Sequence, residues 1–213
     1  MERFQDRYQA GRLLGEQLKF YRNRSDVIVL GLPRGGVPVA AMIAEAINAP
    51  LDLMIVRKLG VPGHEELAFG ALASNRIKVY NEDLLQYLQL SQEAIDEVIS
   101  REESELERRN TIYRGGRPFP DLKNRIVILV DDGIATGASM RAAVLALRKA
   151  SPKKIIVAVP VAPEDMNATM KGLADEYVCL MVPSPFNAVG LWYDDFSQTE
   201  DDEVLSLLNL NNK

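Results

Sequence analysis

Residues 127–140 read Val-Ile-Leu-Val-Asp-Asp-Gly-Ile-Ala-Thr-Gly-Ala-Ser-Met, and the rest of the chain is organised around this stretch. Four consecutive apolar residues predict a buried strand of the kind found inside a parallel sheet. Two adjacent carboxylates, Asp131 and Asp132, follow it, and a short loop then runs from Gly133 to Gly137. A helix with apolar periodicity is expected next. In open α/β sheets with this order of elements, ligands bind beyond the carboxyl ends of the strands.

The chemistry of this loop suits a phosphorylated ribose. A helix start offers unpaired N–H groups and a positive dipole end, which bind phosphate, and the hydroxyls of Thr136 and Ser139 can add donors. The two carboxylates cannot face that phosphate. They can instead accept hydrogen bonds from sugar hydroxyls or hold Mg²⁺. The alternative is an acidic turn that only caps the next helix.

A second strand, loop and helix lies nearer the N-terminus. Val27–Leu32 is expected to be a buried strand, and Val37–Ile47 a helix with a proline in its first turn. The sequence Pro-Arg-Gly-Gly at 33–36 lies between them and suits an anion held by backbone N–H groups and a cation. The alternative is a simple turn with a solvated arginine.

The segment after this helix is predicted to supply two bases and a mobile loop. Leu51–Val56 is expected to be a strand that ends at Arg57 and Lys58, which could neutralise a pyrophosphate. Residues 59–66 are expected to be mobile and solvent-facing. The Arg-Gly-Gly at 114–116 repeats that of 34–36, but no buried helix follows it, so we interpret it as a connector.

The remaining pattern predicts an α/β fold with a parallel sheet flanked by helices, a hairpin and a small C-terminal hood. Residues 1–213 are expected to form one domain, with a core of about 24–182 and a hood of about 183–213 that includes the N-terminal helix. The other predicted elements are helices over 3–21, 81–90, 91–113, 163–173 and 200–208, a hairpin of 67–73 with 76–80, and strands over 154–161 and 177–182.

Aromatic side chains crowd beside acids in the predicted hood. Residues 186–196 read Phe-Asn-Ala-Val-Gly-Leu-Trp-Tyr-Asp-Asp-Phe. Planar heterocycles bind by stacking on such side chains. The alternative is a C-terminal hydrophobic clasp.

Most of the chain resembles the phosphoribosyltransferases that use phosphoribosyl pyrophosphate (PRPP). The match is close at 127–140, good at 32–36 and 57–58, and weakest at 186–196, which is similar to the family's hood over the acceptor base. The resemblance implies transfer of the 5-phosphoribosyl group from PRPP to a nitrogenous base or related amine, with release of pyrophosphate. It also implies Mg²⁺, a cis peptide between Pro33 and Arg34, a flexible loop folding over the reaction centre, and a homodimer.

The resemblance further implies a role for each residue that matches the family's motifs. The implied catalytic residues are Arg34, Lys58 and Asp132. The implied acceptor-binding residues are Phe186 and Trp192. The implied metal-associated residues are Asp131, Asp132 and Asp194, with Asp195 equally near as the third. The implied PRPP-binding residues are Arg34, Gly35, Gly36, Arg57, Lys58, Asp131, Asp132, Gly133, Ile134, Ala135, Thr136, Gly137, Ala138 and Ser139.

Two departures from the family pattern leave the acceptor open. Hypoxanthine-type enzymes carry a third Asp where this chain has Ala135, although adenine- and orotate-type enzymes also carry Ala there. Oxopurine enzymes have a Lys after the strand that corresponds to 154–161, whereas this chain has Ala162 and Pro163. Hypoxanthine or guanine salvage therefore loses support.

Composition narrows the class of protein. The 213 residues are 47% hydrophobic and 26% charged, which is ordinary for a soluble globular protein. The net charge of −5 argues against a nucleic-acid surface. The sequence contains no apolar run of membrane-spanning length and no signal-peptide pattern, so we expect neither. The single cysteine, Cys179, lies in an apolar strand, which predicts a buried thiol. With one cysteine and one histidine we expect no zinc site, and without a cysteine pair we expect a reducing, cytoplasmic setting.

Two other classes of protein share parts of this pattern. A PRPP-binding regulator or sensor without transferase activity would keep the same loops, and it differs from the enzyme in releasing no pyrophosphate. A phosphorylation-dependent receiver domain also has a strand that ends in Asp-Asp. Its acid pair lies on the first strand, however, whereas three strands are expected before the pair here. The transferase is our preferred interpretation and the sensor is the alternative.

Overall fold

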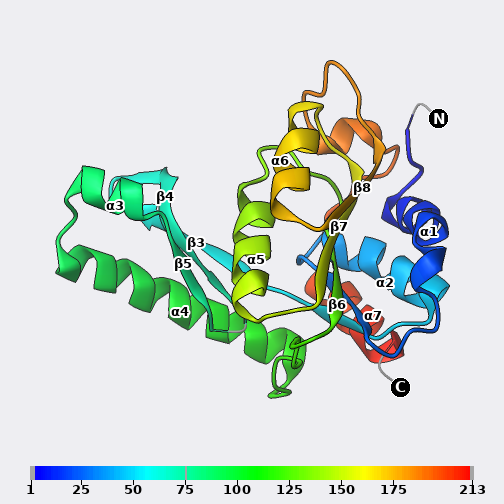
Figure 1. Cartoon of the computed structure of the whole chain (residues 1–213), viewed down its shortest axis with the longest axis horizontal. Coiled ribbons are helices and arrows are strands. Elements are labelled where there is room, and N and C mark those ends of the chain that lie inside the picture. The colour runs from blue at the N-terminus through cyan, green and yellow to red at the C-terminus, as the bar shows by residue number, and fades with distance from the viewer. Residues whose placement is uncertain (1–2, 75, 212–213) are drawn as a thin grey trace.

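A five-stranded parallel sheet forms the centre of the protein (Figure 1). The computed structural model describes residues 3–74 and 76–211. The strands, in spatial order, are β2 (Leu51–Leu53), β1 (Val27–Gly31), β6 (Ile126–Val130), β7 (Lys154–Val161) and β8 (Glu176–Met181). All four pairings in this sheet are parallel. The predicted α/β fold is therefore confirmed.

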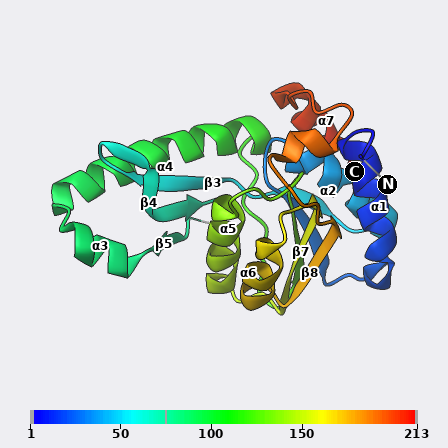
Figure 2. The same cartoon turned by 90° about the horizontal axis from the view of Figure 1, so that it is seen from above.

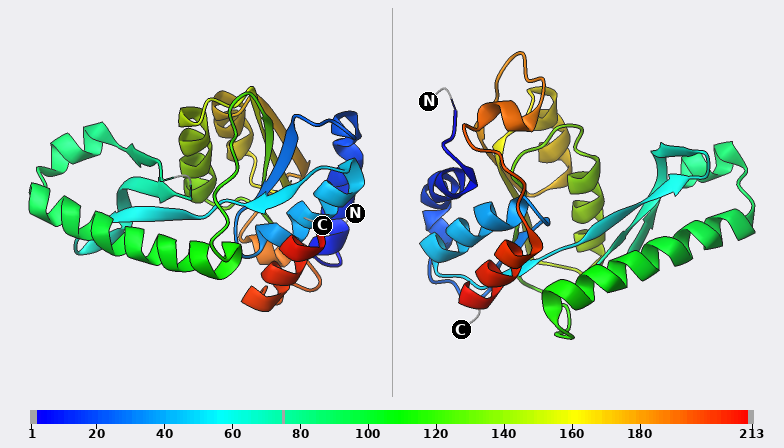
Figure 3. Two further views of the ribbon diagram at one scale, coloured as in Figure 1. Left: turned by 90° about the horizontal axis from the view of Figure 1, so that it is seen from below. Right: turned by 180° about the vertical axis from the view of Figure 1, so that it is seen from behind.

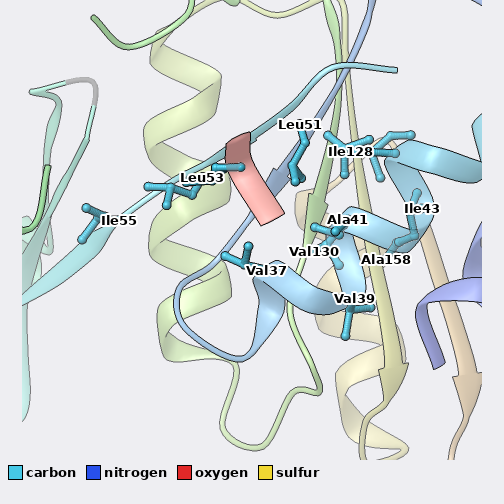
Figure 4. Packing of buried hydrophobic residues seen from close by; sticks show 14 of the residues in the cluster. Val37, Val39, Ala41, Ile43, Leu51, Leu53, Ile55, Ile128, Val130 and Ala158 are labelled. Atoms are coloured by element: carbon cyan, nitrogen blue, oxygen red, sulfur yellow. The ribbon is translucent and has the colours of Figure 1, made fainter. Parts of the chain in front are cut away.

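Helices cover both faces of this sheet, which explains why its central strands are apolar throughout. Val27 and Val29 of β1 pack in one buried cluster with α2 (Gly36–Ile47), while Ile28 and Leu30 pack in another with α5 (Ala138–Lys149). Figure 4 shows the first cluster, with Val37 and Ile43 of α2 facing strand residues. The other helices of the core are α1 (Arg7–Gln17), η1 (Lys19–Tyr21), α6 (Asp165–Leu173) and α7 (Asp201–Asn211).

A second sheet projects from this core together with two helices, and we call residues 56–114 the arm (Figure 2). Its elements are the antiparallel strands β3 (Val56–Val61), β4 (His64–Ala73) and β5 (Lys78–Tyr80), followed by α3 (Glu82–Leu88) and α4 (Gln92–Arg114). Val98 and Leu106 of α4 are buried in the same cluster as residues of β3 and β4. The predicted hairpin is confirmed. The side chains of Asn81 and Ser91 cap the starts of α3 and α4.

One expectation for the first part of the arm is wrong, and a second holds only in part. The parallel strand ends at Leu53, and Arg57 and Lys58 lie inside β3 of the second sheet. The chain turns away from the core at this point, where Nη2 of Arg114 donates to the carbonyl of Leu53. Residues 59–61 and 64–66 belong to the paired strands of the β3–β4 hairpin, and 62–63 form its turn. The turn is exposed as expected, whereas Leu59 and Val61 are buried, so only part of the segment faces solvent.

The C-terminal segment lies against the N-terminal residues (Figure 3). The backbone N–H of Phe4 donates to the carbonyl of Trp192 in the short helix η2 (Val189–Trp192), at 2.9 Å. The N–H of Asp194 donates to the carbonyl of Phe4 at 2.8 Å. The chain then reaches α7, which packs on α2. Within residues 3–74 and 76–211, the helices are too short or too polar to cross a membrane.

Candidate functional site

The loops that follow β1 and β6 lie side by side at the carboxyl edge of the sheet. Gly31 is the register partner of Val130, so the two loops leave the sheet at the same level. The strand order reverses between these two strands, since β2 lies beyond β1 and β7 lies beyond β6. Such a switch point is where open α/β sheets bind ligands. The structure therefore brings the 33–36 loop to the acid pair.

Two glycines bring the loops into direct contact. A Cβ on Gly35 would lie 2.0 Å from Oδ2 of Asp132, and a Cβ on Gly36 would lie 2.7 Å from the carbonyl oxygen of Val130. No other residue type fits at such distances without displacing the acid or the strand end. The peptide between Pro33 and Arg34 is cis, which confirms that expectation.

The acid pair lies in a setting that disfavours its negative charge. Burial raises the pKa of Asp131 well above its usual value, and the neighbouring Asp132 carboxylate raises it further. Burial also raises the pKa of Asp132, while Arg7 opposes that rise. Oδ1 of Asp131 accepts a hydrogen bond from the N–H of Asp132 at 2.8 Å. The pair is thus suited to receive hydroxyl donors or a cation.

Arg7 is a site residue that the sequence analysis missed. Its Nε donates to Oδ2 of Asp132 at 2.8 Å, and the two side chains are only 11% and 16% exposed. Its guanidinium carbon lies 3.9 Å from the ring centroid of Phe196, and its Nη1 donates to the carbonyl of Ser197. The periodicity of the first helix predicts only an apolar face, so the sequence carries no signal for this contact.

The 133–139 loop begins with buried residues and then becomes exposed to solvent. Gly133 and Ile134 are buried, and the N–H of Ile134 donates to the carbonyl of Val161 at 2.9 Å. Gly137 has a φ of +76° and precedes α5, whose start has no side-chain cap. Thr136 and Ser139 are exposed beside it. The open N–H groups and hydroxyls can therefore reach a phosphate from solvent.

Arg34 lies between the predicted anion loop and the C-terminal helix. Its Nη1 is 3.7 Å from Oε2 of Glu200 and 3.7 Å from Oδ1 of Asp201. Asp201 also accepts a hydrogen bond from the hydroxyl of Tyr113 on α4. An anion that bound to the 33–36 loop through Arg34 would therefore have to displace Glu200 and Asp201 from this arginine.

The two bases on β3 lie differently. Nη2 of Arg57 is 2.7 Å from Oε2 of Glu102, a buried acid of α4. Lys58 lines a groove of about 560 Å³ between the arm and α5, which Ala138 and Arg141 also line. Lys58 therefore faces α5, the helix that follows the 133–139 loop. Arg57 is instead held within the arm by Glu102.

The predicted hood residues pack against one another. Phe186 and Trp192 are half-buried in a cluster with Phe4, and Nε1 of Trp192 donates to the carbonyl of Phe186 at 2.9 Å. Asp194 is exposed. Among the residues that the structure describes, no three His, Cys, Asp or Glu side chains form a metal-binding group, so Asp194 does not join the acid pair.

Comparison with known proteins identifies the family to which a domain with this fold and site belongs. The family model described as "Phosphoribosyl transferase domain" matches residues 2–194. The chain belongs to this family.

The proteins that are similar to most of the chain include one curated relative and one solved structure. One is a Mycobacterium tuberculosis protein provisionally named phosphoribosyl transferase Rv0571c, which is 46% identical over 209 residues. The match covers 98% of this chain and 47% of that protein, so the chain spans about half the length of this curated relative. The other is the crystal structure of TT1426 from Thermus thermophilus, which is 40% identical with a TM-score of 0.87. That match covers 99% of this chain and 100% of TT1426.

Proposed function

We propose that this protein transfers the 5-phosphoribosyl group from PRPP to a nitrogenous base or related amine and releases pyrophosphate. The observation that carries the proposal is the contact of the Gly35–Gly36 loop with Asp131 and Asp132 at the switch point of the sheet. An anion loop, a diol-binding acid pair and a second open helix start are thereby gathered within one site. Those are the features that a phosphorylated ribose with a pyrophosphate substituent requires.

Each part of the site has a proposed task. The Asp131 and Asp132 carboxylates accept hydrogen bonds from the ribose hydroxyls, while the 134–139 loop holds the 5-phosphate. The 33–36 loop and Lys58 face the pyrophosphate, where negative charge grows as the bond to the ribose carbon breaks. Holding the remote phosphate positions the reacting carbon. In the structure Arg34 lies near acids of α7, so it has to exchange them for the pyrophosphate.

The acid pair also fits Mg²⁺, which prefers oxygen ligands and usually binds through one or two carboxylates together with substrate phosphates. Asp132 is already engaged by Arg7, which leaves Asp131 as the more available ligand. When bound, the ion supplies positive charge to the pyrophosphate oxygens. Asp194 stays a proposed contributor that would have to act through water or substrate.

The acceptor and the wider setting are also proposals. Phe186 and Trp192 lie on the hood, where a planar base could stack. Arg57 would support the arm rather than touch PRPP, because Glu102 holds it. We propose a cytoplasmic homodimer that does not bind nucleic acid. The acidic net charge of −5 supports the last point, and the absence of an internal cysteine pair fits a reducing compartment.

Pyrophosphate release is the measurement that tests the proposal. The protein is incubated with PRPP and Mg²⁺ against a panel of purines, pyrimidines and other amines, and released pyrophosphate is quantified. We expect release that depends on one acceptor. Tight binding of PRPP without release under every acceptor would instead identify a PRPP sensor. No binding of PRPP would show that the loop at 127–140 has another ligand.

Gly35→Ala is expected to lower acceptor-dependent pyrophosphate release by about 100-fold, because a displacement of roughly 1 Å at a reacting group costs about that factor. The added methyl would lie 2.0 Å from Oδ2 of Asp132, which Arg7 holds in place, so either the acid or the loop has to shift. The matched control is Gly172→Ala on α6, where a Cβ meets nothing within 4 Å. Equal rates for the two variants would show that the loop contact is unimportant.

A further inference from the structure

We infer that the root of the arm holds a second binding site, for a small phosphorylated metabolite that carries hydroxyl groups. The site is a cavity of about 330 Å³ where the arm joins the core, away from the acid pair. Its lining includes Arg76 from the turn before β5, Arg114 from the end of α4, and Arg117 from the following loop. The inference does not depend on the proposed transfer reaction.

Two buried polar atoms in the cavity wall point to a ligand. The side chain of Arg114 is 5% exposed, and its Nε has no hydrogen-bond partner among the described residues. Oδ1 of Asn110, one turn earlier on α4, is likewise buried and unpartnered within that part of the chain. Leaving a buried donor or acceptor unpaired costs about 1–3 kcal/mol. Both atoms are covered in this structure, so each gains a partner when its side chain turns toward a polar ligand in the cavity.

The charge and shape of the cavity favour a phosphate group. Three arginines and one carboxylate, that of Glu107, line it, and Asp52 behind the wall pairs with Arg114. Arg76 and Arg117 therefore supply most of the positive charge that faces the cavity. Arginine presents a planar fork of donors that matches phosphate oxygens. Arg114 is held in place because Nη1 donates to Oδ2 of Asp52 at 2.9 Å and its guanidinium stacks on Phe119. Glu107 and Asn110 can accept hydrogen bonds from hydroxyl groups on the same ligand.

The position of the cavity gives such a ligand a structural consequence. Ser74 at the end of β4 is part of the lining, and its hydroxyl accepts a hydrogen bond from the N–H of Ile55, where the chain passes from core to arm. Arg114 holds Leu53 at the end of the core strand. A ligand that bridges Arg76 and Arg117 would tie the β4–β5 turn to the end of α4 and stiffen the base of the arm.

The test uses the full chain with two probes, inorganic phosphate and ribose 5-phosphate, and hydrogen exchange read by mass spectrometry. We expect both probes to slow exchange in peptides that cover residues 105–119, independently of any effect at 131–140. The variant Arg76→Gln/Arg117→Gln should need at least tenfold more probe to slow exchange at 105–119 to the same extent. The reason is that it removes two charge-assisted contacts. Both side chains lie at the surface, so the variant should fold.

Arg22→Gln/Lys171→Gln is the matched control, since it removes the same charge from exposed positions outside the cavity. Its binding should stay within about twofold of the parent. Tighter binding of ribose 5-phosphate than of phosphate would identify the phosphorylated metabolite, and equal binding would overturn the part played by hydroxyl groups. Unchanged exchange at 105–119 with both probes would mean that the cavity holds water only and would overturn the site. Equal binding by the Arg76/Arg117 variant would overturn it as well.

Discussion

Asp131→Asn is expected to lower pyrophosphate release by about 1,000-fold while raising the free energy of unfolding at pH 7. Activity falls because the variant loses a charge at the place where the proposed ribose hydroxyls and Mg²⁺ bind, and loss of one such electrostatic contact costs up to about 1,000-fold. Stability rises because burial and the Asp132 carboxylate both disfavour the ionised Asp131 side chain, whereas asparagine keeps its shape without the charge.

The pH dependence of this effect follows from the direction of the pKa shift. The pKa of Asp131 is higher in the folded than in the unfolded protein, so the parent protein loses stability as pH rises from the unfolded value toward the folded one. The difference in free energy of unfolding between Asp131→Asn and the parent should therefore shrink as pH falls from 7 toward 4, where the native Asp131 side chain holds its proton. Urea unfolding across that range measures it.

The control for Asp131→Asn is Glu97→Gln, which removes a charge from an exposed position on α4. It should change the free energy of unfolding by less than about 0.5 kcal/mol and leave the rate unchanged. If Asp131→Asn were less stable than the parent at pH 7, the electrostatic account of the acid pair would be wrong.

Arg7→Met is expected to lower the free energy of unfolding by about 3 kcal/mol at pH 7, because it removes one partner of a largely buried ion pair. The Asp132 carboxylate would be left beside Asp131 with no cation at 2.8 Å. The stacking of Arg7 on Phe196 is lost as well. Denaturant unfolding of the purified variants measures the change.

A double-mutant cycle separates the ion pair from the stacking. Arg7→Met/Asp132→Asn should lose less stability than the sum of the two single variants, since it removes both charges. Arg148→Met is the control, because the Arg148–Asp175 pair is 39% and 38% exposed and such pairs contribute less than about 1 kcal/mol. Simple additivity in the Arg7–Asp132 cycle would assign the whole effect to the contacts of Arg7 with Phe196 and Ser197.

Most of the fold, and the two loops of the candidate site, could be predicted from short stretches of neighbouring residues. The apolar runs that became β1 and β6 have to be buried on both faces, and their periodicity requires no information from distant residues. The loops at 33–36 and 133–139 follow these runs directly. Parallel strands place their carboxyl ends at one edge, so the sequence predicts that both loops lie at that edge. The structure alone shows that β1 and β6 are neighbours and that the two loops meet.

The boundaries of the arm were harder to predict. Residues 51–61 are a nearly continuous β-forming stretch, and nothing local marks the break at Leu53. The break depends on Arg114, 61 residues later, which binds the carbonyl of Leu53. The same limitation hid the partner of Arg57, because Glu102 lies 45 positions away on a helix whose periodicity indicates only a thin apolar stripe.

The parallel sheet, the loop at 33–36 and the acid pair with the 133–139 loop could all be read from the amino-acid sequence, because each depends on neighbouring residues and their spacing. The cation that faces these acids became visible only in the folded protein. Arg7 meets Asp132 across 125 positions because α1 packs on α2 and the hood covers the N-terminal segment. Contacts of that kind depend on the angle and depth at which helices pack, and those are set by the whole core at once.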